Sequence, residues 1–247
     1  AGACTLWLPT QHPEGVRNMA QVVTGLAPEA IEIVPMSAGG SYGRKAEVDF
    51  GLHALRAAMA VGRPVQVLWD RRHDLQHDFY RPNALARLEG GLDASGRLVA
   101  LTADYAGPAV WSPQSAWNHW GLVPSPYTQP ARRVRYVHDD QCVPVSWNRG
   151  VGHQKGLFFV ERGLDELAHA GGLDPLQIRL DHLEDAPRCR AVLERAAALA
   201  DWGNPSVPGA AHGLALLSHY ATTYIALVVE VSVEEGSRVV AHVAWFA

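Results

Sequence analysis

Three short signatures that could bind a ligand lie in a fixed order along this chain. They are Gln11, residues 39–45 (Gly-Gly-Ser-Tyr-Gly-Arg-Lys) and residues 147–152 (Trp-Asn-Arg-Gly-Val-Gly). Each falls where an apolar, strand-like stretch gives way to a helical pattern, and backbone N–H groups at such turns are free to bind a ligand. Three of them in series predict one composite site.

The residue types in these signatures suit the binding of a polar or anionic group. The neutral amide of Gln11 can orient a ligand oxygen without adding charge. Glycines between a buried strand and a helix let the backbone approach a ligand closely. Arg149, ahead of a helix start, could clamp an anion or a polar substrate edge. The alternative interpretations are a plain turn, a solvated glutamine and a solvated or acid-paired arginine.

Other patterns for common chemistries are weak or absent in the sequence. Residues 39–45 match neither GxxxxGK[ST] nor GxGxxG, and no GxSxG nucleophile motif occurs. His73 and His77 have metal-ligand spacing on a helix, but Arg71 and Arg72 lie beside them. We therefore predict a polar surface helix there and no metal bound directly by side chains.

Bulk properties narrow the class of protein. The chain has 247 residues, is 48% hydrophobic and carries a net charge of -4, so it can bury a large core but offers no basic field for nucleic acid. No apolar run approaches the roughly 20 residues that span a bilayer. Three widely spaced cysteines without CxxC disfavour a disulfide framework or a cysteine-ligated cluster. Strand-like runs at both ends predict a part of a larger polypeptide, and the compartment stays open between bacterial cytoplasm and periplasm.

The pattern of elements predicts an α+β fold with mixed sheets and βαβ-like elements. Expected strands are 4–8, 31–36, 65–69, 84–92, 97–105, 132–137, 225–233 and 239–245, and expected helices begin near 13, 48, 155 and 187. Residues 107–130 are rich in proline and tryptophan and predict a long aromatic loop. A composition break at 203–212 predicts one domain over residues 1–205 and the start of a second, truncated β-rich domain over 206–247.

The residue types and order of these segments resemble those of a known enzyme family. Trp-x-Pro-Thr-Gln, then Gly-Gly-x-aromatic-Gly-Arg-Lys, then Arg-Gly-x-Gly ahead of a helix that ends Leu-Asp-Glu-Leu-Ala, resembles the molybdenum-binding large subunit of xanthine oxidase and aldehyde oxidoreductase enzymes. Residues 69–82 and 174–180 (Asp-Pro-Leu-Gln-Ile-Arg-Leu) resemble one branch of it, the β-subunits of isoquinoline 1-oxidoreductase. The similarity extends over nearly the whole chain.

The resemblance implies a hydroxylase that oxidises aldehydes or N-heterocycles with water as the oxygen source. It implies a molybdopterin cofactor with molybdenum, in cytosine dinucleotide form, a partner subunit with [2Fe-2S] clusters and an external electron acceptor. By position, Gln11 would contact a molybdenum oxo group and Arg149 would polarise the substrate, while cofactor contacts would come from Gly39, Gly40, Ser41, Tyr42, Gly43 and Gly150. The loop from Trp111 to Trp120 would line the channel through which substrate reaches the site.

Two departures from the family pattern bear on activity. No Gly-x-Gly-Glu segment is present to supply the general base, and no Gly-Gln-Gly segment is present to hold the pterin dinucleotide. Since such a base contributes about 10²–10⁴-fold, we predict that this chain alone is catalytically incompetent. The alternatives are a non-catalytic scaffold or assembly module of the same fold, and an unrelated small-anion-binding α/β domain.

Overall fold

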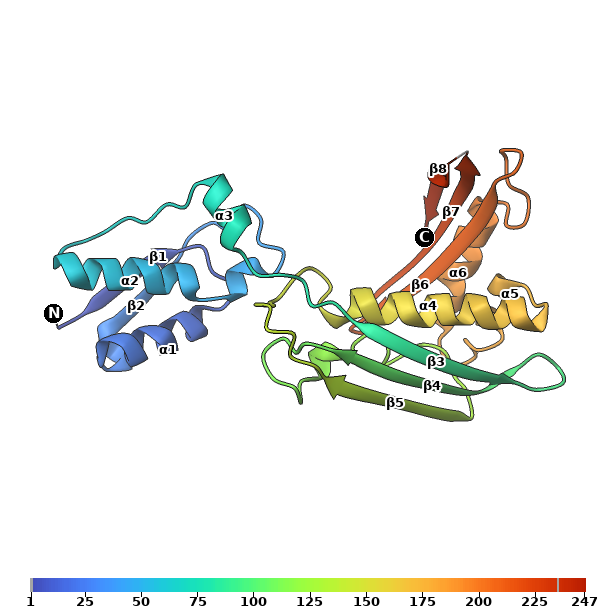
Figure 1. Cartoon of the computed structure of the whole chain (residues 1–247), viewed down its shortest axis with the longest axis horizontal. Helices are drawn as coiled ribbons and strands as arrows, with labels where there is room; N and C mark the ends of the chain where they lie inside the picture. The colour runs from blue at the N-terminus through green and yellow to red at the C-terminus, as the bar shows by residue number, and fades with distance from the viewer. Residues whose placement is uncertain (1, 235) are drawn as a thin grey trace. The chain divides into compact units, whose positions relative to one another are not determined.

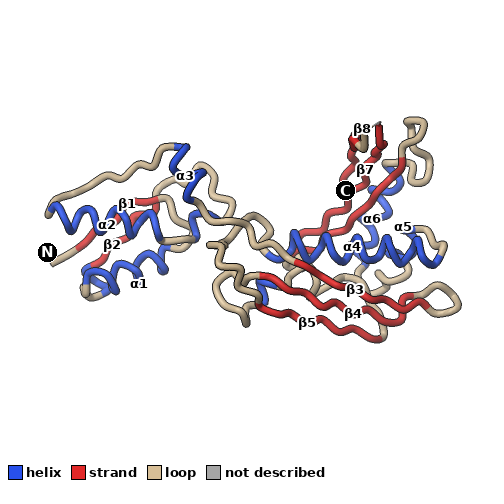
Figure 2. Tube along the Cα trace, in the orientation of Figure 1, coloured by secondary structure: helices blue, strands red, loops and turns tan. Residues whose placement is uncertain are grey.

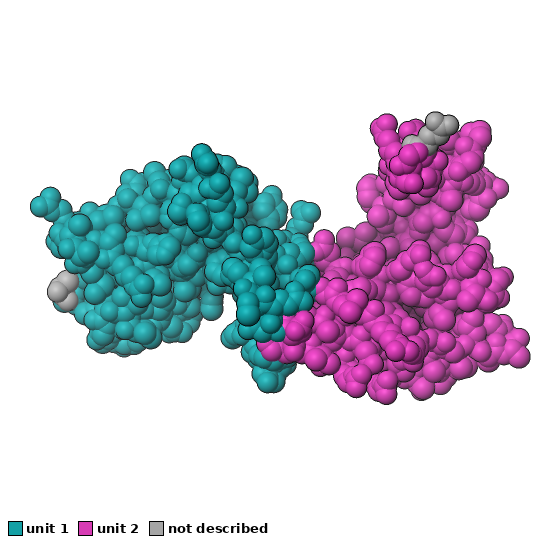
Figure 3. Space-filling model, in the orientation of Figure 1, with its two compact units in different colours: residues 1–83, 108–115, 140–151 teal, residues 84–107, 116–139, 152–247 magenta. Residues whose placement is uncertain are grey.

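The computed structural model describes residues 2–234 and 236–247, and its contacts divide the chain into two compact units (Figure 3). Unit 1 comprises Ala1–Asn83, Pro108–Ser115 and Asp140–Val151, and unit 2 comprises Ala84–Gly107, Ala116–Asp139 and Gly152–Ala247. Each unit is therefore assembled from segments that are distant in the sequence. Both contain helices and sheets, which confirms the predicted α+β class.

Unit 1 is built on a parallel pair of strands, β1 (Cys4–Leu8) and β2 (Ile31–Pro35), connected by helix α1 (Pro13–Thr24) (Figure 1). Helix α1 begins at a proline, whose missing N–H has no partner to lose there, and ends at Gly25 in the left-handed conformation. The predicted βαβ-like unit is thus present. Its core consists of Leu6, Leu8, Val16, Ala20, Ile31 and Leu55.

The remaining elements of unit 1 are helical. They are the 3₁₀ turns η1 (Pro28–Ala30) and η2 (Arg44–Ala46) and the helices α2 (Asp49–Val61) and α3 (Arg71–His77). The strand predicted at 65–69 is wrong, because these residues form no strand and Leu68 is 83% exposed. An apolar, β-branched run indicates an extended backbone, but a strand also needs a neighbouring strand for its hydrogen bonds.

Unit 2 contains two three-stranded sheets (Figure 2). In the first, β3 (Leu85–Leu92) and β4 (Leu98–Gly107) form the predicted hairpin, and β5 (Ala131–His138) pairs parallel with β4. In the second, β6 (Ala211–His219), β7 (Thr223–Glu234) and β8 (Arg238–Phe246) are antiparallel neighbours in chain order. Helix α4 (Gly152–Gly171) contacts both β3 and β6, so a single core serves both sheets.

Two elements of unit 2 were not expected from the sequence pattern, namely strand β6 and the short helix α5 (Pro175–Leu180). Asp174 caps the start of helix α5, and its carboxylate accepts bonds from two backbone N–H groups. Helix α6 (Pro187–Leu199), which was expected, covers β7. Residues 206–247 belong to unit 2 by their contacts, and the domain boundary expected near residue 205 stays a prediction.

The aromatic loop is irregular apart from the 3₁₀ turn η3 (Ala116–Asn118), as its prolines predict. Its Trp117 and Trp120 lie in unit 2 and pack on the first turns of α4. A Cβ at Gly152 would lie 2.1 Å from the Trp117 carbonyl oxygen, and one at Gly156 would lie 2.3 Å from that of Trp120. Glycine is therefore required at both positions. None of the helices in the described part of the chain combines the length and apolar character that a bilayer crossing demands.

Candidate functional site

Residues 41–44, which we name the glycine turn, reverse the chain between β2 and α2. The Arg44 N–H donates to the Ser41 carbonyl at 2.9 Å, and both central residues have positive φ, 53° at Tyr42 and 103° at Gly43. This is the pattern of a type I′ turn, which glycine adopts freely. A tyrosine in that conformation costs about 1–2 kcal/mol, so Tyr42 is locally strained.

Gly43 allows the glycine turn to touch the third signature. A Cβ on Gly43 would lie 2.7 Å from the Trp147 carbonyl oxygen and 3.1 Å from the Asn148 nitrogen. Only a residue without a side chain fits there. The backbone contact between two signatures that are about a hundred residues apart thus depends on this glycine.

Residues 148–151, which we name the arginine turn, present Arg149. The Val151 N–H donates to the Asn148 carbonyl at 2.8 Å, and Gly150 has a φ of 88°. A glycine at the third position of such a turn supplies the positive φ that a type II turn requires. The guanidinium carbon of Arg149 lies 5.7 Å from the centre of the Tyr42 ring. This cation–π contact joins the arginine turn to the glycine turn.

Gln11 is held beside the same loop by backbone bonds. Its N–H donates to the Lys45 carbonyl at 2.8 Å, and the Thr10 hydroxyl donates to the same oxygen at 3.3 Å. The Lys45 ammonium in turn donates to the Ala38 carbonyl at 2.6 Å. Gln11 itself is exposed. The structure therefore brings all three signatures together around residues 42–45, within unit 1.

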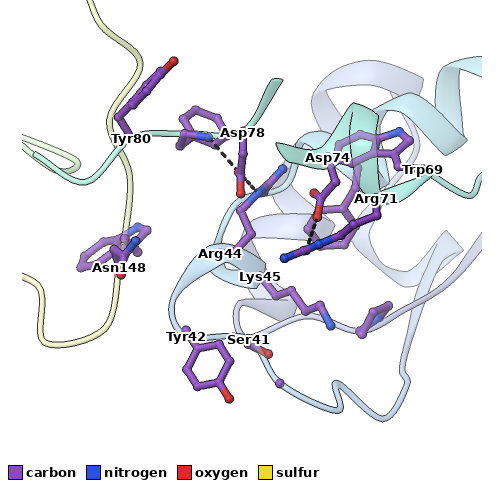
Figure 4. Close-up of a pocket in the computed structure, with 15 residues that line it drawn as sticks. Ser41, Tyr42, Arg44, Lys45, Trp69, Arg71, Asp74, Asp78, Tyr80 and Asn148 are labelled. Carbon is purple, nitrogen blue, oxygen red and sulfur yellow. Dashed lines mark hydrogen bonds and ion pairs between the residues drawn. The ribbon is translucent and has the colours of Figure 1, made fainter. Parts of the chain in front are cut away.

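A cavity of about 480 Å³ adjoins the glycine turn (Figure 4). Its walls are both aromatic and charged and come from the glycine turn, α2, α3, the segments next to α3 and residues 147–148. The aromatic residues are Tyr42, Phe50, Trp69, Phe79, Tyr80 and Trp147, and the charged ones are Arg44, Lys45, Arg71, Asp74 and Asp78. Gln11 and Arg149 are not among the residues that line it. Trp111 lies beside this region, with its ring centre 6.2 Å from that of Trp147. The aromatic loop therefore contributes to unit 1 through Trp111 alone among its three tryptophans.

Arg44 anchors the glycine turn, a role that the sequence did not suggest. Its guanidinium donates two bonds to the Asp49 carboxylate, at 2.9 and 2.8 Å, and forms an ion pair with Asp78 (Figure 4). Burial lowers the pKa of Arg44, but the Asp49 and Asp78 carboxylates outweigh burial and raise it above its usual value. Two features of the sequence could have indicated this role. Arg44 directly follows the last glycine of the turn, and Asp49 stands at the start of the next helix.

The histidine pair on α3 has the geometry predicted from its spacing. The His73 and His77 rings lie on one side of the helix with centres 4.6 Å apart, and both side chains are exposed. Across residues 2–234 and 236–247, no three His, Cys, Asp or Glu side chains are grouped so that they could hold a metal ion.

Comparison with known proteins shows the family. Residues 1–183 match the molybdopterin cofactor-binding domain, and the chain belongs to that family. It is 30% identical over 246 residues to the β-subunit of isoquinoline 1-oxidoreductase from Brevundimonas diminuta, covering 93% of this chain and 31% of that protein. It is 32% identical over 219 residues to a nicotinate dehydrogenase subunit of Pseudomonas putida, covering 82% of this chain and 18% of that protein. The chain thus spans less than a third of the length of either relative.

Solved structures show the same fold. Quinoline 2-oxidoreductase from Pseudomonas putida 86 matches with a TM-score of 0.71 at 22% identity, over 92% of this chain and 32% of that one. CO dehydrogenase from Oligotropha carboxidovorans matches with a TM-score of 0.72 at 15% identity, over 96% of this chain and 36% of that one. The family resemblance seen in the sequence is confirmed. The alternative of an unrelated anion-binding domain is wrong, because the family's fold and its sequence pattern occur together.

The residues present fit an anionic pterin cofactor. No backbone acceptor is found within the described residues for the N–H groups of Ser41, Tyr42 and Gly43. A Cβ at Gly39 would meet no atom within 4 Å, so the approach to this loop is open. The carboxylates around the cavity are each paired with an arginine, Asp49 and Asp78 with Arg44 and Asp74 with Arg71, so their negative charge is offset. Free amides in a left-handed turn form a concavity that suits negatively charged groups.

Proposed function

We propose that this chain contributes part of the active site of a molybdenum hydroxylase that oxidises aldehydes or N-heterocycles with oxygen from water. The observation that carries the proposal is the meeting of Gln11, the glycine turn and the arginine turn within unit 1 of a molybdopterin-binding chain. The names of the relatives support the substrate classes, since they are an isoquinoline oxidoreductase and a nicotinate dehydrogenase.

Each signature has a proposed task. When bound, the molybdenum cofactor supplies two-electron oxidation chemistry. The Gln11 amide, held by its backbone bond to Lys45, offers a neutral donor to an oxygen of that centre. The amides of residues 41–43 bind the cofactor's polar edge, together with Gly39, Gly40 and Gly150. Arg149 places a fixed positive charge where negative charge develops on the substrate, as preorganised donors do.

The cofactor form and the partners are part of the proposal. We propose a cytosine dinucleotide form of the pterin, a small subunit whose [2Fe-2S] clusters pass electrons to an external acceptor, and the remainder of the large subunit as the source of the general base. The sequence supports the last point, because no Gly-x-Gly-Glu segment occurs among the 247 residues. The isolated chain is then expected to be inactive.

The test is elemental analysis of the full-length protein, purified with whatever copurifies, combined with release of the pterin nucleotide. We expect stoichiometric molybdenum in the wild type, in Arg149→Met and in Gln11→Ala. Turnover of aldehydes or N-heterocycles with a dye acceptor should fall by about 10²–10³-fold in Arg149→Met, the usual effect of losing one preorganised donor.

The matched controls are Arg72→Met and Gln66→Ala, because both side chains are exposed, lie in unit 1 and are not among the residues that line the cavity. Wild-type protein that contains no molybdenum would refute the proposal and would favour the non-catalytic scaffold of the same fold. Full turnover in Arg149→Met would remove this residue from the proposed chemistry.

A further inference from the structure

Residues 78–81 (Asp-Phe-Tyr-Arg) contact both turns of the candidate site. Asp78 follows helix α3 and forms an ion pair with Arg44, the residue that closes the glycine turn (Figure 4). Arg44 is also fixed from its other side by Asp49 at the start of α2. The position of the glycine turn in unit 1 is therefore set by carboxylates from two different segments.

Arg81, three residues later, contacts the arginine turn. One of its terminal nitrogens, Nη2, donates both to the Asn148 side-chain oxygen and to the Arg149 carbonyl, the latter at 3.1 Å. The guanidinium fork suits this task because its donors are fixed in one plane, whereas a lysine ammonium is a single flexible point charge. Arg81 therefore holds both the Asn148 side chain and the Arg149 backbone.

The electrostatics of Arg81 are unfavourable for a residue with a purely structural role. Burial lowers its pKa, and the nearby charge of Arg149 lowers it further. Its second terminal nitrogen, Nη1, is buried and has no hydrogen-bond partner in the part of the chain that the structure describes. A half-buried cation with one buried, unsatisfied nitrogen next to a like charge reduces stability. Such local cost is commonly found where a functional geometry is maintained.

The backbone around Arg81 is pinned to the extended segment before the arginine turn. The Tyr80 N–H donates to the Pro144 carbonyl at 2.8 Å, and the Ser146 N–H donates to the Tyr80 carbonyl at 3.1 Å. The Asn83 amide donates to Gln141 at 2.7 Å. These bonds give the Arg81 side chain a fixed base, so its length determines where the arginine turn lies.

We propose that Asp78 and Arg81 are positioning residues that together hold the glycine turn and the arginine turn at one separation. Asp78 acts through Arg44, and Arg81 acts through Asn148 and the Arg149 backbone. The role of the pair in turnover rests on the proposed function, whereas its effect on the geometry of the turns does not. This gives a task to part of the 69–82 segment, which the proposed roles of the three signatures leave unused.

The geometric test is hydrogen exchange on the full-length protein. The Val151 N–H, which closes the arginine turn, should exchange at least about 10-fold faster in Arg81→Met than in the wild type, because the turn loses its two side-chain bonds. Arg81→Lys should restore only part of this protection. The matched control Arg72→Met, an exposed arginine on α3, should leave the rate unchanged. Equal exchange rates in Arg81→Met and Arg72→Met would overturn the proposal.

The functional test uses the same variants and adds Asp78→Asn. Molybdenum content should remain at the wild-type level while kcat/KM falls by about 10–100-fold in Arg81→Met and Asp78→Asn, the usual range for residues that orient other ligands. Arg81→Met combined with Asn148→Ala should show less than the product of the two single effects, because both remove the same bond. A fully multiplicative result would overturn the shared role.

Two outcomes separate this inference from the proposed function. Faster exchange in Arg81→Met in a protein that contains no molybdenum would support the positioning role and refute the hydroxylase. Stoichiometric molybdenum with unchanged exchange and unchanged kcat/KM in the same variant would support the hydroxylase and refute the positioning role. If Arg81→Met does not fold, Asn148→Ala removes only the acceptor and should still accelerate exchange at Val151.

Discussion

The polar networks of the two units differ in burial. In unit 1 Arg44 joins the glycine turn to the start of α2 and to Asp78, and Arg81 joins the segment after α3 to the arginine turn; these side chains are half-buried. In unit 2 a buried network joins α4, α5, β6 and the loop residue Tyr127. Glu161 on α4 accepts from Arg179 on α5 at 2.9 Å, from the Tyr127 hydroxyl at 2.8 Å and from the Leu216 N–H on β6 at 3.1 Å.

This difference indicates that unit 2 mainly supports folding and unit 1 mainly supports binding. Unit 2 has the larger core, and its charged centre joins helices α4 and α5 to strand β6, so we expect substitutions there to cost the most stability. Unit 1 keeps half-buried charges around the turns where the ligand is proposed to bind. Substitutions in unit 2 should therefore affect folding first, while substitutions in the turns of unit 1 should affect binding and turnover first.

The largest expected effect comes from breaking the buried pair of unit 2. Arg179→Met leaves the Glu161 carboxylate buried without its cation, since both side chains are almost fully buried. Removing one member of such a pair typically costs about 3–5 kcal/mol. Urea unfolding of the full-length protein should show a loss of this size, or the variant should not accumulate in soluble form.

A surface pair provides the matched control for that substitution. Arg162 and Glu166 form an ion pair on the same helix, α4, with both side chains about 60% exposed (63% and 59%). Arg162→Met should cost less than about 0.5 kcal/mol. Comparable losses for Arg162→Met and Arg179→Met would contradict the view that the buried centre carries the stability of unit 2.

The next effect concerns the contact between the two signatures in unit 1. Gly43→Ala adds a Cβ that would lie 2.7 Å from the Trp147 carbonyl oxygen, at a φ of 103°. Strain and overpacking together should cost about 2–4 kcal/mol, and molybdenum should be lost. Gly62→Ala is the control, because Gly62 in unit 1 also has a positive φ (67°), a Cβ there would meet no atom within 4 Å, and Gly62 belongs to none of the three signatures. If both variants bind molybdenum alike, close approach at Gly43 is unimportant.

A smaller effect is expected in the pH dependence of stability. Burial, and then the neighbouring His219, hold the pKa of His153 at about 4, below its usual value of 6.5. The folded state therefore favours neutral His153, and its contribution to stability is full above pH 6.5 and is lost as the pH falls toward 4. His153→Phe should flatten the fall in unfolding free energy between these values, whereas exposed His169→Gln should not. An unchanged slope in His153→Phe would contradict this assignment.

The smallest effect should have the opposite sign. Tyr42→Asn replaces a strained tyrosine that is 68% exposed with a residue that tolerates positive φ, so the protein should become more stable by up to about 1 kcal/mol. The same change removes the ring that contacts Arg149, so kcat/KM should fall. A variant that gains stability without losing turnover would show that this strain has no function.

Much of the fold could be predicted from short-range patterns. The periodicity of residues 4–61 indicated β1, α1, β2 and α2, because apolar spacing, Pro13 and Gly25 mark these elements locally. The failure at 65–69 and the omission of β6 have a common cause. Whether an apolar run becomes a strand depends on a neighbour that can lie anywhere in the chain, and no local pattern reports that neighbour.

The candidate site likewise has features that the sequence determines and features that only the folded structure determines. The sequence by itself determined the family, the order of the three signatures and the residue types that they offer. Only the tertiary structure decided that Gly43 meets Trp147, that Asp78 holds Arg44 and that Arg81 holds Asn148, which is 67 residues away. Backbone preferences act over a few residues, whereas such contacts depend on how the whole unit packs, and packing is a property of the folded chain.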